Sequence, residues 1–321
     1  MRTFVYAAAL AVVASQAAAA TWELDSYVDY PIYSGDQSGL YKTQGIAWNP
    51  ERNEWITSWQ YGLGRTTEDF TTLQTTGGVD LSTGQLIDGI PAELAALGFD
   101  HIGDIDVYNG VIYASLDSEA GDYQNGHIAL FSATDLSYLG VLQPMVGSES
   151  NPHNDVASWV AVDGSAGLAY GKEWKSGNTI NVYYLDTMEF KETLTMDMAL
   201  RNIQGAKILG DTMYLAAHDS TKSVYSLDLL TGHVTELFQL PTLANAFNET
   251  EGIALRQLDD GTVEMWIEMI MNPNGNGDTD SWVRLYRYIS TDAVIAPVPL
   301  PATLPLALAG LAGLRLLRRR K

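Results

Sequence analysis

The sequence predicts an all-β fold, a β-propeller of five four-stranded blades, with a distorted six-bladed ring as the alternative. First, Asn109-Gly110 joins two alternating runs, 105–108 and 111–114, and this dipeptide favours a tight hairpin because both turn residues take positive φ. Second, the 321-residue chain has 29 Gly and 17 Tyr, which suits short strands joined by turns. Third, similar hairpins recur at steps of 59, 52, 49 and 47 residues, with first residues Gln44, Gly103, Asp155, Gln204 and Glu251.

The remaining strands complete four-stranded units. In the first repeat, the inner pair is predicted at 44–48 and 54–59 and the outer pair at 78–81 and 85–88, although 61–76 has room for further strands. A short helix is expected over 91–97, where Pro precedes an Ala/Leu run. Later strands are predicted at 127–131, 138–142, 155–163, 168–174, 179–185, 190–196, 204–208, 213–219, 224–228, 234–238, 251–255, 263–268 and 282–288.

The fifth repeat ends one strand short of a full blade. Residues 22–28 alternate like a strand and have no hairpin partner of their own. We therefore expect this N-terminal strand to complete the fifth blade, which leaves no open edge between the first blade and the last.

Charge and composition exclude several classes of function. The net charge is −21, and six of the 18 basic residues but none of the 39 acidic residues lie in the two end segments. The body between them therefore carries 12 basic and 39 acidic residues, a net charge of −27. Such a surface repels nucleic acid and anionic lipid. The chain has no Cys, so disulfides and Cys-ligated metals are excluded.

The two ends predict export of a body spanning 21–292. Residues 1–20 have a basic start, an apolar segment over 4–14 and several A-x-A cleavage positions, which together are typical of a signal peptide removed by signal peptidase. Residues 293–321 hold the motif Val298-Pro299-Leu300-Pro301-Ala302, then an apolar segment over 304–314, then an Arg cluster. That apolar segment would be about 16 Å long as a helix, whereas a bilayer core is about 30 Å thick. The whole stretch 294–317 is long enough for a transmembrane helix, but four prolines interrupt its first half.

This tail resembles the VPLPA-CTERM signal, a variant of the PEP-CTERM sorting signals of Gram-negative bacteria. The resemblance implies recognition by an exosortase-type transpeptidase and cleavage near the motif. It also implies transient anchoring in the inner membrane and delivery to the cell surface or extracellular matrix. A plain C-terminal anchor helix is the alternative, and in either case the body meets a membrane only through the tail.

The candidate site consists of polar residues at the starts of the inner strands. In a propeller these starts meet at one end of the central channel, so the side chains are expected to lie close together. The candidate metal ligands are Asp104, Asp155 and Glu251, the candidate ligand-binding residues are Gln44, Asn154 and Gln204, and the candidate catalytic residues are His101 and His153. Carboxylate and amide oxygens suit Ca²⁺, and two histidines with carboxylates would also suit Zn²⁺ or Mn²⁺. The alternative is structural, since polar side chains can satisfy free backbone groups at the channel.

The openings Glu251-Gly252-Ile253-Ala254 and Gln44-Gly45-Ile46-Ala47 resemble those of the gluconolactonase and strictosidine-synthase-like propellers, and also those of the esterase-like phytase propellers. The resemblance implies that Glu251 is a metal ligand, completed by Asn154, Asp155 or Asp104. A lactonase of this type would use bound Ca²⁺ to polarise the carbonyl, and a carboxylate or His to activate water.

Two hypotheses of function follow. One is a non-enzymatic protein that binds a small molecule, a glycan or Ca²⁺ at the channel mouth. The other is a metal-dependent hydrolase of lactones or phosphoesters. Residues 272–280 form a second candidate Ca²⁺ loop or an ordinary hairpin loop, whereas His127, His218 and His233 are expected at the surface. Five tryptophans either stack on sugars or pack between blades: Trp48, Trp55, Trp59, Trp159 and Trp174.

Overall fold

The computed structural model describes residues 21–34, 37–80, 82–118, 126–145, 157–172, 174–274 and 280–291. The predicted signal peptide and sorting tail lie outside these ranges, as do His153, Asn154 and Asp155. Within the described ranges, no helix is both long and apolar enough to cross a bilayer.

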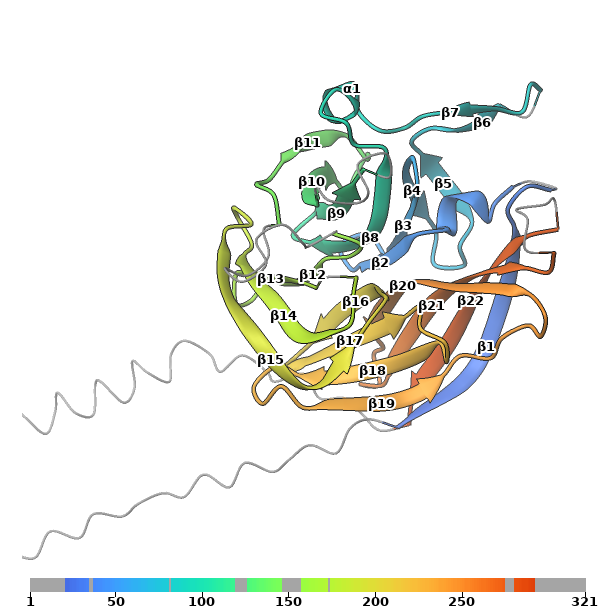
Figure 1. Cartoon of the computed structure of the whole chain (residues 1–321). Helices are drawn as coiled ribbons and strands as arrows, with labels where there is room; N and C mark the ends of the chain where they lie inside the picture. Colours follow the sequence, from blue (N-terminus) through green and yellow to red (C-terminus); the bar gives the residue numbers. More distant parts are fainter. Residues whose placement is uncertain are drawn as a thin grey trace, which may run out of the picture.

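Five four-stranded antiparallel sheets form a ring, which confirms the five-bladed propeller (Figure 1). Blade 1 consists of β2 (Gly45–Asn49), β3 (Glu54–Trp59), β4 (Gly62–Thr66) and β5 (Thr72–Thr75). Blade 2 consists of β8 (His101–Tyr108), β9 (Val111–Asp117), β10 (His127–Ser132) and β11 (Tyr138–Val141). Blade 3 consists of β12 (Ala161–Asp163), β13 (Leu168–Gly171), β14 (Gly177–Tyr184) and β15 (Phe190–Leu200). Blade 4 consists of β16 (Ile203–Leu209), β17 (Thr212–Ala217), β18 (Ser223–Asp228) and β19 (Val234–Gln239).

Blade 5 contains strands from both ends of the described chain, as predicted. Its strands are β20 (Phe247–Gln257), β21 (Val263–Asn272), β22 (Trp282–Ser290) and β1 (Trp22–Pro31). β1 pairs antiparallel with β22, from Trp22 opposite Ser290 to Pro31 opposite Trp282. The ladder closes the ring through backbone hydrogen bonds, so the last blade does not end in an open β22 edge.

The outer half of blade 1 differs from the prediction. Its third and fourth strands are β4 and β5, whereas β6 (Gly78–Asp80) and β7 (Gln85–Ile87) form a separate hairpin that projects beyond the ring (Figure 1). β4 is buried along its whole length and contains two glycines, so its sequence has no polar–apolar alternation to reveal it. The predicted short helix is confirmed as α1 (Ala92–Ala95).

The inner strand of blade 3 is also shorter than predicted. β12 covers only Ala161–Asp163, and residues 157–160 have no strand structure although their apolar side chains are buried. Neighbouring blades bury these apolar residues without strand pairing. A local sequence pattern looks the same in both cases, so it predicted a longer strand.

The hydrophobic core lies between the blades. The described residues form five buried clusters, and each cluster joins side chains of two neighbouring blades. Trp55, Trp59 and Trp159 are at most 1% exposed and pack within these interfaces, so the packing role holds for them. Trp48 and Trp174 are half-buried.

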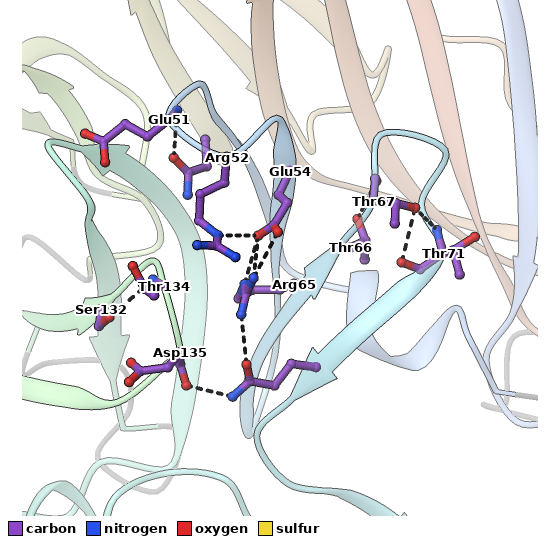
Figure 2. Close-up of polar contacts among 12 residues, drawn as sticks. Glu51, Arg52, Glu54, Arg65, Thr66, Thr67, Thr71, Ser132, Thr134 and Asp135 are labelled. Atoms are coloured by element: carbon purple, nitrogen blue, oxygen red, sulfur yellow. Dashed lines mark hydrogen bonds and ion pairs between the residues drawn. The ribbon is translucent and has the colours of Figure 1, made fainter.

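A polar network supplements the apolar contact between blades 1 and 2 (Figure 2). Arg65 of β4 donates from Nε and Nη2 to the Glu54 carboxylate at 2.9 Å each, and from Nη1 to Gln74 Oε1 at 3.0 Å. Gln74 Nε2 then donates to the Asp135 carbonyl of blade 2 at 2.7 Å. The bidentate guanidinium–carboxylate geometry holds β3, β4 and β5 in register beside the next blade.

Candidate functional site

The candidate site lies at one end of the ring, which we call the head end, where β2, β8, β16 and β20 begin. Three of these strands shift register within their first residues, between Ile102 and Ile105, between Ile203 and Gly205, and between Thr250 and Ile253. A bulge changes the face toward which the following side chains point. The bulges thus determine which head residues face the axis.

Glycines bring the blades together at the axis. A Cβ on Gly252 would lie 2.5 Å from the Gly45 Cα, and one on Gly45 would lie 2.6 Å from the Asp104 Cα. A Cβ on Gly205 would lie 2.8 Å from the Ile253 amide nitrogen. These neighbours are backbone atoms that cannot move aside, so only glycine fits. The glycine of the repeated Gln-Gly and Glu-Gly pairs therefore serves close packing of blades 1, 2, 4 and 5.

Asp104 joins three blades at this point. Its Oδ1 accepts a hydrogen bond from the Ile46 amide at 3.2 Å, and its Oδ2 accepts from the Ala206 amide at 3.2 Å and from Lys207 Nζ at 2.8 Å. Burial raises the pKa of the Asp104 carboxyl to about 7, and the charge of Lys207 opposes that rise. Both oxygens are engaged by the protein, so Asp104 acts here as a structural centre.

Glu251 and Glu268 form a buried acidic layer with Asp104. Burial raises the pKa of Glu251 well above its usual range, and the charges of Glu249, Glu268 and Asp104 add to that rise. Burial likewise raises the pKa of Glu268, helped by the charge of Asp104 and opposed by that of Lys42. Both Glu268 oxygens are shielded from solvent, and the backbone amide of Gly252 opposes the rise in the pKa of Glu268. A carboxyl in such surroundings is favoured in its neutral, protonated form.

His101 and Gln44 meet above this layer. His101 Nδ1 lies 2.7 Å from Asp117 Oδ1, and its Nε2 lies 3.0 Å from Gln44 Oε1. Asp117 ends β9 directly opposite His101 in the strand register. The imidazole is thus oriented on both sides, by a buried carboxylate of its own blade and by an amide of blade 1.

His218 lies at the head end too, half-buried rather than at the open surface as expected. Its Nδ1 accepts hydrogen bonds from the Thr250 amide and from Lys222 Nζ, both at 3.2 Å. Burial and the charge of Lys222 lower the pKa of His218 to about 4. The imidazole is therefore neutral near pH 7, with its proton on Nε2.

Glu249 interacts electrostatically with both His101 and Lys222. Burial raises the pKa of Glu249, while the charges of Lys222 and His101 lower it. Burial lowers the pKa of Lys222, and Asp219, Glu249 and Glu251 counteract that effect. We call Gln44, His101, His218, Lys222 and Glu249 the rim cluster; all five are half-buried and they come from blades 1, 2, 4 and 5.

Sequence reasoning missed three of these five residues because it considered only the first residue of each inner strand. Glu249 lies in β20 two residues before Glu251, just ahead of the register shift between Thr250 and Ile253, so a repeat taken to begin at Glu251 left it out. His218 follows the second strand of blade 4, the place that Asp117 occupies at the end of the second strand of blade 2. Gln204 lies half-buried at the β16 bulge, and its side chain makes no hydrogen bond to a described residue.

The oxygen ligands of the acidic layer suit a metal ion, but the arrangement of these side chains does not. Carboxylate oxygens are preferred Ca²⁺ ligands, yet no three His or acidic side chains among the described residues converge to hold an ion. Asp155 of the predicted metal set lies outside the described ranges, as do residues 275–279 of the second candidate loop.

Glu268→Gln is expected to make the free energy of unfolding fall less between pH 5 and pH 8 than it does in the parent protein. The folded pKa of Glu268 is raised, so the folded state keeps a proton that the unfolded chain releases above its ordinary pKa of 4.5. Stability therefore falls as pH rises above that value. Urea unfolding at both pH values measures the slope. Glu192→Gln, at an exposed carboxyl, is the control, and equal slopes in both variants would contradict the prediction.

Comparison with known proteins gives likeness of fold only. No family model matches the chain, and no curated protein matches it. Hydrazine synthase of Kuenenia stuttgartiensis is similar at 11% identity and a TM-score of 0.41, over 79% of this chain and 64% of that one, so this chain spans less than two thirds of it. Regucalcin of Agrobacterium tumefaciens, a calcium-binding protein, is similar at 11% identity and a TM-score of 0.46, over 81% of this chain and 95% of that one. At these values the comparisons carry no argument about function.

Proposed function

We propose that this protein is an exported β-propeller that binds a small polar ligand at the head end. The observation that carries the proposal is the rim cluster, in which four blades supply half-buried donors and acceptors to one place. A propeller that only needed to satisfy its backbone at the axis would not require two histidines, a lysine with a lowered pKa and a carboxyl with a raised pKa there.

Ca²⁺ is the first ligand to test. Glu249, Glu251 and Glu268 of the rim and the acidic layer have raised pKa values, so each keeps its proton to a higher pH than an ordinary carboxyl does. A bound cation would favour their ionised forms and release those protons, so affinity should rise with pH. A small hydroxyl-rich molecule, such as a sugar, is the second ligand of this proposal.

Ca²⁺ titration by calorimetry is expected to show tighter binding at pH 8 than at pH 6, because a bound cation must displace the proton of a carboxyl with a raised pKa. Glu249→Gln should weaken binding at pH 8 about tenfold, and the exposed control Glu192→Gln should not. Repeating the titration in buffers of different ionisation enthalpy counts the protons released. Absence of binding, or the same affinity at both pH values and in Glu249→Gln, would rule out Ca²⁺ at the rim cluster.

The export part of the proposal rests on the sequence of the two end segments. The proposed location is the cell surface or extracellular matrix of a Gram-negative bacterium, reached through signal peptidase and an exosortase-type transpeptidase. The strongly acidic body supports a partner other than nucleic acid or an anionic membrane surface.

A metal-dependent lactonase or phosphoesterase is the second candidate. It is favoured by His101, which is oriented by Asp117 at 2.7 Å, next to Glu249 with its raised pKa. An imidazole and a carboxyl of this kind could exchange a proton with a water molecule. Ca²⁺-dependent hydrolysis of a lactone or phosphoester that disappears in His101→Asn would establish an enzyme, whereas Ca²⁺ binding without hydrolysis would leave the binding protein.

A further inference from the structure

A second site lies at the opposite end of the ring, where blade 5 meets blade 1. A groove of about 630 Å³ there, which we call the seam groove, is lined by Tyr30, Glu68, Phe70, Arg256, Trp266 and Arg287, among others. Its volume is within the roughly 300–1,000 Å³ of small-ligand sites. β20 begins at the head end and Arg256 lies near its other end, so this groove is separate from the rim cluster.

Two guanidinium groups are held in fixed positions in the seam groove. The Glu264 carboxylate is fully buried beneath them and forms ion pairs with the Nε atoms of Arg256 and of Arg287, the latter at 2.8 Å. Arg256 Nη1 donates to Glu68 at 2.6 Å, and Arg287 Nη1 donates to Asp25 at 2.7 Å. Among the described residues, neither arginine makes a hydrogen bond through its Nη2 group.

Aromatic side chains form the apolar part of the groove. The ring centroids of Phe70 and Trp266 are 4.9 Å apart, and those of Tyr30 and Phe70 are 6.3 Å apart. The Trp266 Nε1–H is shielded from solvent and has no hydrogen-bond partner within the described part of the chain. Because a ligand cannot reach a shielded atom, Trp266 contributes its ring to the groove rather than its N–H group.

The loop 67–71, between β4 and β5, places the buried side chain of Phe70 in the wall of this groove. Phe70 has φ of +64°, a left-handed conformation that costs free energy for a bulky residue. Its ring stacks on Trp55 with centroids 5.4 Å apart. The Thr71 amide donates to Thr67 Oγ1 at 3.0 Å and holds the turn closed (Figure 2). This wall of the groove is therefore held in place by contacts within the protein and does not need a ligand to form.

These features select the class of ligand. Arg256 and Arg287 nearly balance Glu68, Asp69 and Glu264 in charge, and the surrounding surface is acidic, so a polyanion is disfavoured. The groove combines donors, acceptors and aromatic rings, and a sugar presents hydroxyls that both donate and accept beside an apolar C–H face. We propose that the seam groove binds a neutral oligosaccharide.

Native affinity electrophoresis of the purified protein tests the proposal, in gels that contain hydroxyethyl cellulose, dextran or the acidic polymer polygalacturonate. At least one neutral polymer is expected to retard the protein. Trp266→Phe, which reduces the aromatic surface of the groove, and Glu68→Gln, at a side chain 63% exposed, should each weaken that retardation about five- to tenfold. Trp282→Phe is the matched control, because it makes the same change at another half-buried tryptophan, one that does not line the groove.

Thermal unfolding of each variant checks that the fold is retained. Retardation by a neutral polymer that Trp266→Phe and Glu68→Gln weaken, and Trp282→Phe does not, supports the site. Retardation by polygalacturonate alone, no retardation by either neutral polymer, or equal retardation of all variants overturns the proposal. None of these results depends on whether the rim cluster binds Ca²⁺.

Discussion

Asp104→Ala is expected to lower the free energy of unfolding by about 3–5 kcal/mol, the range for breaking a buried ion pair from one side. The substitution leaves the Lys207 ammonium, which is 5% exposed, without its carboxylate. It also removes the acceptor for the Ile46 and Ala206 amides, and so cuts the links from blade 2 to blades 1 and 4. Urea unfolding at pH 8 measures the loss under conditions in which Asp104, with a pKa of about 7, is mostly ionised.

Two further variants separate the charge from the hydrogen bonds of Asp104. Asp104→Asn keeps one acceptor oxygen and should cost less than Asp104→Ala. Adding Lys207→Met to Asp104→Asn should recover stability, because the unpaired buried ammonium is then gone. Asp260→Ala, at an exposed surface turn, should cost no more than about 1 kcal/mol. A loss below about 1 kcal/mol in Asp104→Ala would show that the axial carboxylate is not the structural centre.

Gly252→Ala is expected to destabilise the ring by about 3 kcal/mol, the upper end for overpacking, or to prevent folding. The new Cβ would lie 2.5 Å from the Gly45 Cα and 2.8 Å from the Ile46 amide nitrogen. Relief of that overlap requires blades 1 and 5 to move apart, which opens the interface that holds Trp55 and Ala254. Thermal unfolding and soluble yield measure the effect.

Gly177→Ala is the control for Gly252→Ala. A Cβ at Gly177 would meet only the flexible end of Lys172, at 3.7 Å, so the variant should unfold like the parent. If Gly252→Ala also melts within about 2 °C of the parent, which corresponds to about 1 kcal/mol for a domain of this size, then close axial packing is not what the repeated glycine provides.

The number of blades and the closure of the ring were predictable from the sequence. A four-stranded repeat with a period near 50 residues has few other folds, and the unpaired strand at 22–28 had one place to go, beside β22. The outer half of blade 1 was not predictable. β4 has no alternation because both of its faces are buried, whereas 78–81 and 85–88 alternate well but pair only with each other.

The candidate site, too, was predictable from the sequence only in part. The sequence by itself predicted that Gln44, His101, Gln204 and Glu251 lie at one end of the ring, because each lies near the predicted start of an inner strand of its repeat. Only the tertiary structure decided their roles. Bulges in β8, β16 and β20 separate the half-buried rim from the acidic layer beneath it. Second strands then add Asp117, His218 and Glu268, whose proximity to the first strands depends on register and on contacts between blades that no local pattern encodes.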